Sequence, residues 1–140
     1  STQKEVKKSF FSNGNLEYEA EFFNGKLDGT SKVWLEDGTL HSISKYSNNQ
    51  PHGIWKKFYP NGKLMFEVNY EYGKKHLLWA FWDERGYQRF EEWRMGVLYD
   101  TFEYEYYENG QLKEEPSYKN RKNIIICDFC FERKVIMTFN

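Results

Sequence analysis

Residues 58–64 read Phe-Tyr-Pro-Asn-Gly-Lys-Leu, a short polar turn signal with apolar residues on both sides. Asn-Gly between two apolar runs is a strong signal for a β-hairpin, because a type I′ turn requires positive φ at both of its central residues. The segment therefore predicts two antiparallel strands joined by a tight type I′ turn at Gly62.

The same turn signal recurs at a fixed spacing of 24 residues. Asn-Gly or Asp-Gly with Leu two residues after the glycine appears in four copies, and the copy at residues 84–88 keeps the glycine without the leucine. Five turns in one register predict five stacked hairpins, each of which buries its apolar side only against its neighbours. The five glycines are Gly14, Gly38, Gly62, Gly86 and Gly110.

A second turn follows each tight turn, as in residues 24–29, and the strand between them alternates. Leu16, Tyr18, Ala20 and Phe22 occupy every second position, which is the pattern of a half-buried strand. The chain is also 20% aromatic and has only two alanines, as expected for β structure. We therefore expect an all-β fold, an elongated single meander of antiparallel β-hairpins with about five full copies, forming one domain over residues 1–140.

A partial sixth copy is expected at the C-terminus. Its apolar strand is residues 124–127, a further strand begins near Val135, and Lys134 replaces the turn glycine. Cys127 and Cys130 have the spacing of half a zinc or redox site. Side chains three apart on a strand point to opposite faces, and no second pair completes a four-sulfur site, so reduced thiols are expected.

Composition argues against several classes of function. The formal net charge is −1, whereas nucleic-acid binders usually carry a marked basic excess, so no nucleic-acid partner is expected. No apolar run approaches the ~20 residues of a membrane span, and no polybasic segment suggests a membrane surface, which makes a membrane partner an unfavourable interpretation. Two cysteines in 140 residues do not make a disulfide-dense scaffold.

The repeat words resemble those of a known family. Residues 58–64 and 106–112, together with residues 24–29 and 51–56, look like MORN repeats and most resemble the bacterial MORN variant of proteins often labelled antitoxin-like. The resemblance covers roughly residues 6–128 and is weaker in the fourth and fifth copies. It implies an array of β-hairpins that serves as a protein-binding scaffold without catalytic residues; some members were proposed to contact phospholipids.

One column of the repeat contains potential metal ligands. Asp28, His52, His76 and Asp100 follow the second turns. Equivalent positions lie two strands apart, ~9.6 Å, whereas zinc needs ligands at ~2 Å, so neighbours in the column should not share an ion. We expect polar turn residues, with no metal and no cofactor.

Two features suggest a partner surface. Residues 83–115 hold ten acidic and four basic side chains, a net charge of −6 that would attract a basic partner unless it is only a soluble face. The strand at residues 78–83 is apolar on both faces, as if both were covered, either by a partner or by the chain itself. We therefore predict a partner surface of aromatic residues bordered by acids. Its residues are Trp55, Tyr59, Trp79, Phe81, Glu91, Glu92, Glu103, Glu105 and Tyr107.

These patterns favour a non-enzymatic protein-binding module, and specifically an immunity or antitoxin-like protein that blocks a basic toxin or effector. A structural or membrane-associated scaffold is the alternative, and an enzyme is a third interpretation without a catalytic motif to support it. A cytoplasmic location is expected from the free cysteines. The chain begins at Ser1 without Met, which removal of the initiator methionine or cleavage of an export signal would both explain, so the compartment stays open.

Overall fold

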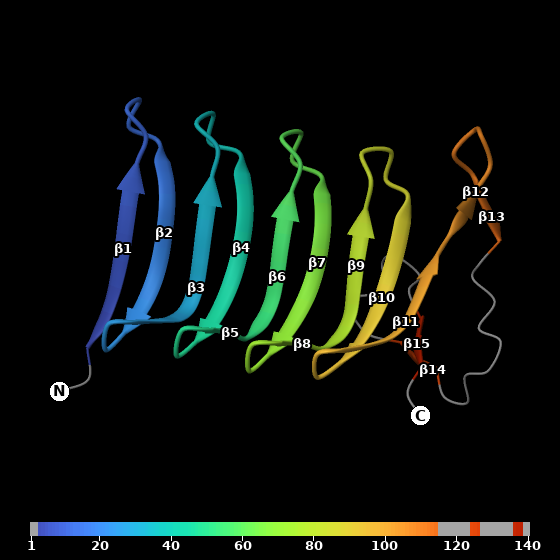
Figure 1. The fold of residues 1–140 in the computed structure, drawn as a ribbon. Coiled ribbons are helices and arrows are strands. Elements are labelled where there is room, and N and C mark those ends of the chain that lie inside the picture. Colours follow the sequence, from blue (N-terminus) through green and yellow to red (C-terminus); the bar gives the residue numbers. More distant parts are fainter. Residues whose placement is uncertain (1–2, 115–123, 127–135, 139–140) are drawn as a thin grey trace. The chain divides into compact units, whose positions relative to one another are not determined.

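The fold was obtained as a computed structural model that describes residues 3–114, 124–126 and 136–138. The chain divides into two compact units, residues 1–103 and 104–140, and each is described by itself. The expectation of a single domain over the whole chain stays a prediction. The all-β fold class is confirmed: the described residues contain strands and turns, without a helix (Figure 1).

The first unit is an antiparallel meander in a single sheet. Its strands follow the order β1-β2-β3-β4-β6-β7-β9-β10-β11, with the short strands β5 and β8 paired to β4 and β7. The strands are β1 (Lys4–Phe10), β2 (Leu16–Phe23), β3 (Lys26–Trp34), β4 (Leu40–Ser47), β5 (Gln50–Pro51), β6 (Gly53–Phe58), β7 (Leu64–Glu71), β8 (Lys74–Lys75), β9 (Leu77–Trp82), β10 (Gln88–Arg94) and β11 (Val97–Glu103).

The tight turns lie at one end of the strands, at the top of Figure 1. Their geometry differs from the expected turn type. In the third copy Gly62 N–H donates to Tyr59 O at 2.8 Å, and Tyr59 N–H donates to Lys63 O at 2.8 Å. Gly62 has φ 83°, whereas Asn61 is not among the residues with positive φ. This is a type I turn followed by a left-handed glycine, not a type I′ turn. Asn61 contributes by accepting the Lys63 N–H on its side chain at 2.9 Å.

The fourth tight turn uses a different residue for the same purpose. Arg85 stands where other copies have Asn or Asp, and Asp83 Oδ1 accepts the N–H groups of both Arg85 and Tyr87, at 2.9 and 3.0 Å. Burial acts to raise the pKa of Asp83, but the hydrogen bonds and charge of Arg85 and the Tyr87 N–H outweigh it, so the pKa is lowered. The turn is therefore kept although its usual side chain is missing.

The type I′ geometry occurs instead at the second turns, which lie at the opposite end of the strands. Both central residues have positive φ there, for example 48° at Asn24 and 78° at Gly25, and 47° at Tyr72 and 79° at Gly73. The turns are also joined to one another, since Gly73 N–H donates to Pro51 O at 2.8 Å. Each copy is thus held to the next at its turns as well as along its strands.

A third glycine position becomes a leucine in the fourth copy. Gly29 and Gly53 follow the second turns with φ near 108°, and Leu77 stands in their place with φ 62°. At Gly29 a Cβ would clash with the Glu21 side chain, which folds back to accept the Thr30 N–H. Leu77 therefore carries backbone strain that the glycines avoid.

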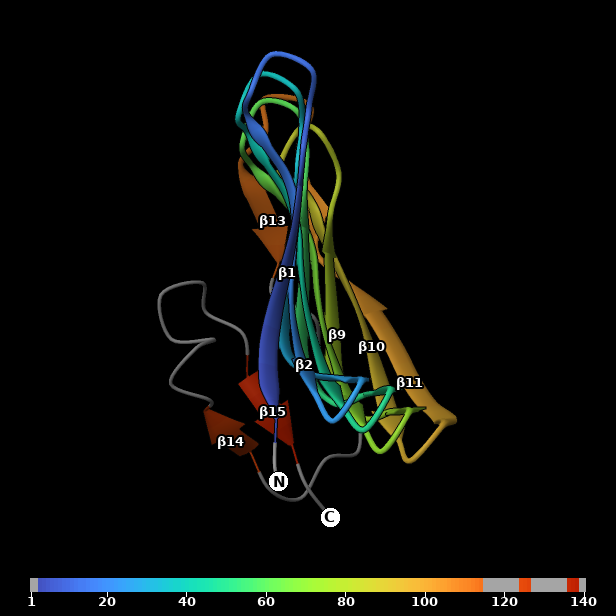
Figure 2. The same ribbon diagram turned by 90° about the vertical axis from the view of Figure 1, so that its left-hand side faces the viewer.

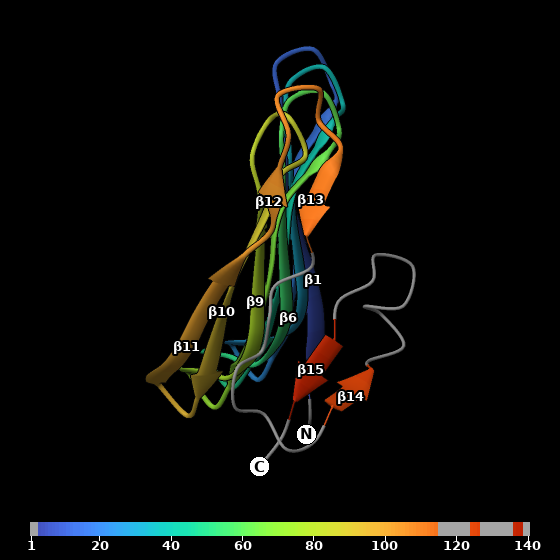
Figure 3. The ribbon, with the colours of Figure 1, turned by 90° about the vertical axis from the view of Figure 1, so that its right-hand side faces the viewer.

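The first unit is one layer of strands with two faces. Seen edge-on, the strands lie in a single twisted layer (Figures 2 and 3). Register places Trp55, Phe66, Val68, Trp79 and Phe81 on one face, which we call face A. The opposite face, face B, carries Lys56 and Glu67, an ion pair at 3.5 Å, and Ala80, Trp82 and Phe90, which are buried.

The second unit contains the fifth tight turn. Strands β12 (Glu105–Tyr106) and β13 (Leu112–Glu114) pair across Gly110, whose φ is 83°. Strands β14 (Ile124–Ile126) and β15 (Ile136–Thr138) pair with each other, as expected of the partial sixth copy. The predictions for Cys127, Cys130 and Lys134 lie outside the described residues.

Replacing Gly62 by valine should lower the free energy of unfolding by about 1–3 kcal/mol, because a β-branched residue resists positive φ. No atom lies within 4 Å of a Cβ built at this position, so the cost is conformational rather than steric. Urea unfolding followed by circular dichroism measures it. Lys63→Val in the same exposed turn is the control, expected to stay within about 0.5 kcal/mol of the parent. Equal effects of the two variants would contradict the assignment.

Candidate functional site

A continuous row of aromatic side chains crosses five strands on face A. Its ring centroids lie 5.2 Å apart from Tyr46 to Trp55, then 5.0 Å to Tyr70, 5.1 Å to Trp79 and 5.9 Å to Trp93. We call these five residues the aromatic row. All ring pairs are tilted or edge-on, which is the arrangement favoured by the aromatic quadrupole.

The repeat explains the regularity of the row. Trp55 and Trp79 are 24 residues apart, and each donates its indole N–H to a backbone carbonyl ten residues earlier. The acceptors are Lys45 O at 2.8 Å and Asn69 O at 2.9 Å. Each indole is therefore fixed in orientation, with its ring lying along the sheet toward the tyrosine of the neighbouring strand.

Cations cover the end of the row that lies on β9 and β10. The ammonium of Lys75 lies 4.5 Å from the ring centroid of Trp79 and 4.2 Å from that of Trp93. The Arg89 guanidinium lies 4.0 Å from the Phe81 ring. Cation–π contacts of this kind contribute about 0.5–1 kcal/mol each at exposed sites and more where water is excluded.

Glu91 is the acid that accompanies these cations. It lies directly opposite Trp79 in the register of β9 and β10. Its Oε2 accepts the Trp93 indole N–H at 2.9 Å, and its Oε1 lies 3.2 Å from Arg89 Nη1. The end of the aromatic row thus combines two indoles, a lysine and a carboxylate on one face.

The predicted site residues of the first unit separate into two groups. Trp55, Trp79, Phe81, Glu91 and Glu103 lie on face A, as the register of β6 to β11 shows. Glu103 lies opposite Arg89 rather than in the row of Trp79. The prediction that they bind a partner is not tested by their placement.

Of the two covers left open for the strand at residues 78–83, the chain itself covers Trp79. Trp79 does not lie on an uncovered second face: it shares face A with Phe66 and Val68, the regular apolar positions of the repeat, and is only 7% exposed. The irregular apolar side is the opposite one, with Ala80 and Trp82. Trp79 is therefore a core residue of the sheet, because its neighbours in the row surround it.

The remaining predicted residues are placed elsewhere. Tyr59 lies in the tight turn and donates its hydroxyl to Trp82 O at 2.7 Å. Glu92 lies on face B, 7% exposed and 3.3 Å from Arg94. Glu105 and Tyr107 belong to the second unit, where Glu105 lies 3.5 Å from Lys113 and Tyr107 is exposed. Within the first unit, Tyr59 and Glu92 therefore lie apart from the aromatic row.

Sequence reasoning missed Tyr46, Tyr70, Trp93 and Lys75. A signal for the first three was present, since each lies two residues before a second turn, where Phe22 lies in the first copy. Burial raises the pKa of the Tyr46 and Tyr70 hydroxyls, with smaller contributions from the neighbouring tyrosines. Both hydroxyls therefore stay neutral over the physiological range and keep the row uncharged.

The column of potential metal ligands connects neighbouring turns. Asp28 accepts the Asn48 N–H at 3.1 Å, and His52 Nδ1 accepts the Tyr72 N–H at 3.1 Å. His76 Nδ1 accepts the Met95 N–H at 3.2 Å. Within the described part of the chain, no group of three or more His, Cys, Asp or Glu side chains is arranged to hold a metal ion. Asp28, His52 and His76 thus connect neighbouring turns, whereas Asp100 lies within β11 and accepts the Thr101 N–H at 2.8 Å.

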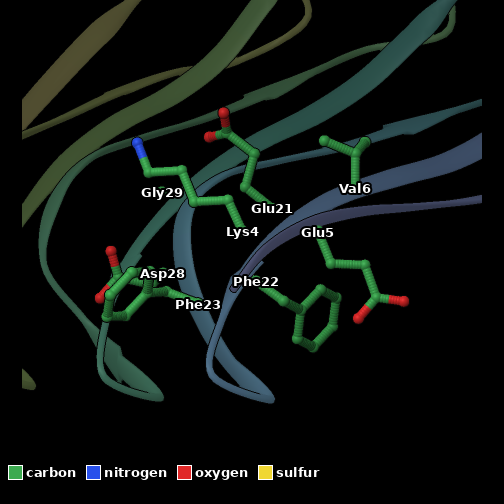
Figure 4. A pocket seen from close by; sticks show the side chains of 8 residues that line it. All are labelled: Lys4, Glu5, Val6, Glu21, Phe22, Phe23, Asp28 and Gly29. Carbon is green, nitrogen blue, oxygen red and sulfur yellow. The ribbon is translucent and has the colours of Figure 1, made fainter. Parts of the chain in front are cut away.

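A hollow of about 280 Å³ lies where β1, β2 and β3 meet (Figure 4). Two of its three carboxylates are engaged by the backbone: Glu21 accepts the Thr30 N–H and Asp28 accepts the Asn48 N–H, while Glu5 is the third. The arrangement provides neither a nucleophile with a base nor a set of metal ligands, so we regard it as a surface hollow between turns.

Three segments of the chain match the model of the MORN repeat variant, at residues 6–24, 51–72 and 103–120. MORN repeats are generally non-catalytic repeat modules. No curated protein and no solved structure matches the chain. In the described residues, no helix has the length and apolarity to cross a membrane.

Truncating Trp79 to alanine should lower the free energy of unfolding by about 3–5 kcal/mol, the usual cost of removing a buried tryptophan. Ile54→Ala, on face B and 43% exposed, should cost less than about 1 kcal/mol. Urea titration of the two variants compares them. A Trp79→Ala variant as stable as the parent would show that the aromatic row is not part of the core.

Proposed function

We propose that the protein is a non-enzymatic repeat module that binds a protein partner through face A of its first unit. The aromatic row supports this proposal most directly. It runs across five strands of a one-layer sheet, and Tyr46, Trp55, Tyr70 and Trp93 are only half-buried. Tryptophan and tyrosine are enriched at the energetic centres of protein interfaces, where large rigid rings are desolvated by a partner.

The charges near the row favour a basic partner. Three arginines of the acidic segment are already paired within the chain, Arg85 with Asp83 at 2.7 Å, Arg89 with Glu91 at 3.2 Å and Arg94 with Glu92 at 3.3 Å. The part of this segment in the first unit, residues 83–103, holds six acids against these three arginines, a net charge of −3. One of these acids, Glu103, is exposed on face A. Such a border accelerates encounter with a positively charged surface.

A toxin or effector with a basic active surface fits these requirements, so we propose an immunity or antitoxin-like role in the cytoplasm. The resemblance to the bacterial MORN variant supports this role by analogy. A scaffold on an anionic membrane is less favoured, because the acidic segment would be repelled by anionic lipid. Vesicles of anionic phospholipid should accordingly fail to co-sediment the protein.

The proposal predicts that Trp55→Ala weakens capture of the basic partner from an extract of the source cell by roughly thirtyfold, the typical loss for truncation at an interface centre. Ile54→Ala is the matched control, since it alters the adjacent residue on face B and should bind like the parent. Circular dichroism verifies that both variants are folded before their affinities are compared.

A charge reversal at an exposed position is a second test of the binding surface, because it does not alter the packing of the core. Glu103→Lys, at an exposed position on face A, should lower the association rate and its salt dependence, whereas Glu84→Lys in an exposed turn should have a smaller effect. If the folded Trp55→Ala and Glu103→Lys variants both bind like the parent, face A is not the binding surface.

A further inference from the structure

The two indoles at the end of the aromatic row hold a cation in the free chain. Lys75 lies opposite Tyr70 at the edge of face A, and its ammonium approaches the rings of Trp79 and Trp93 within 4.5 and 4.2 Å. Two rings face one ammonium, and Glu91 beside them accepts the Trp93 indole N–H and lies 3.2 Å from Arg89, an arrangement similar to sites that recognise cationic groups.

This arrangement arises from departures from the repeat at one place. The position of Lys75 is apolar in the earlier copies, and the position of Glu91 is small or apolar. The position of Trp93 holds smaller rings. The equivalents are Leu27 and Pro51 for Lys75, Ala20, Ser44 and Val68 for Glu91, and Phe22, Tyr46 and Tyr70 for Trp93. The earlier copies thus pack with uncharged residues at the positions of Lys75 and Glu91.

We propose that Trp79, Trp93 and Glu91 form a receptor for a lysine side chain of the protein partner, and that Lys75 occupies this receptor in the free chain. The inference rests on the proposed function and specifies the group that face A recognises. Lys75 covers the two rings while no partner is present, and the ammonium of the partner replaces it with the same contacts. The exchange conserves charge at the site, because one ammonium leaves as another enters.

Removing the internal occupant should open the receptor to a small cation. The probe is the tetramethylammonium ion, and tert-butanol is the neutral probe of similar bulk. Binding is measured by NMR, from the upfield shift of the probe's methyl protons near the rings and from the indole N–H signals of Trp79 and Trp93. The variant is Lys75→Met. Its matched control is Lys74→Met, an exposed neighbour on the same short strand.

Lys75→Met should bind tetramethylammonium at least fivefold more tightly than the parent and Lys74→Met, since loss of one competing contact of about 1 kcal/mol corresponds to that factor. Glu91→Gln in the Lys75→Met chain should reverse the gain while keeping an acceptor for the Trp93 indole. Neither substitution should change the affinity for tert-butanol.

Equal affinities of Lys75→Met and the parent would overturn the proposal, as would equal binding of the two probes. Should Lys75→Met not fold, Lys75→Gln takes its place with the same expectations. The assay contains no protein partner, so its failure is distinguishable from failure of the proposed function. Loss of the receptor with capture still dependent on Trp55 would leave face A as the binding surface without a lysine-specific site.

Discussion

The left-handed glycine that closes each tight turn is the constraint on which the sheet depends. Glycine adopts positive φ without the steric cost that a Cβ imposes, and here it allows a type I turn to return the chain with the twist of the flanking strands. Gly14, Gly38, Gly62 and Gly86 repeat this conformation with φ between 83° and 89°. Because the spacing is constant, each hairpin begins in the same register as the one before.

Because the hairpins share a register, equivalent side chains recur on the same face of the sheet. From β1 to β9, positions 24 residues apart fall on the same face, so Trp55 and Trp79 repeat one another, and each indole binds the carbonyl ten residues before it. The tyrosines between them complete the aromatic row. The row is thus both a core and a surface: Trp79 is buried by its neighbours, whereas rings on either side of it remain half-exposed. Because the described residues form no helix, a one-layer sheet has few other ways to cover large apolar side chains.

The hairpins, their spacing and the opposite directions of Trp79 and Trp82 could be predicted from the sequence, because glycine spacing and alternation determine them directly. The turn type could not, since Asn-Gly fits both geometries. The side chains that lie next to one another on neighbouring strands could not be predicted from the sequence either. The second-turn glycine follows the tight-turn glycine by 11 positions from Gly62 to Gly73, but by only 10 positions from Gly86 to Gly96. The stretch from Gly96 to Gly110 is one residue longer than its counterpart, so the spacing of the tight turns stays 24. Glycine spacing conceals this slip, which places Glu91 and Thr101 beside Trp79 and moves Glu103 to the row of Phe81. The occupant of the Trp79–Trp93 pair, Lys75, follows from three-dimensional contact alone.

The repeat assembles one continuous aromatic row on one face, and the proposed cation receptor lies at its end. Proton NOESY of the five tryptophan indoles tests this claim most directly. Cross-peaks should connect Trp55 with the rings of Tyr46 and Tyr70, and Trp79 with those of Tyr70 and Trp93, while Trp82 shows none to this group. Cross-peaks from Trp82 to Trp79 or Tyr70, or their absence between Trp79 and Trp93, would contradict the register and with it the surface proposed to bind the partner.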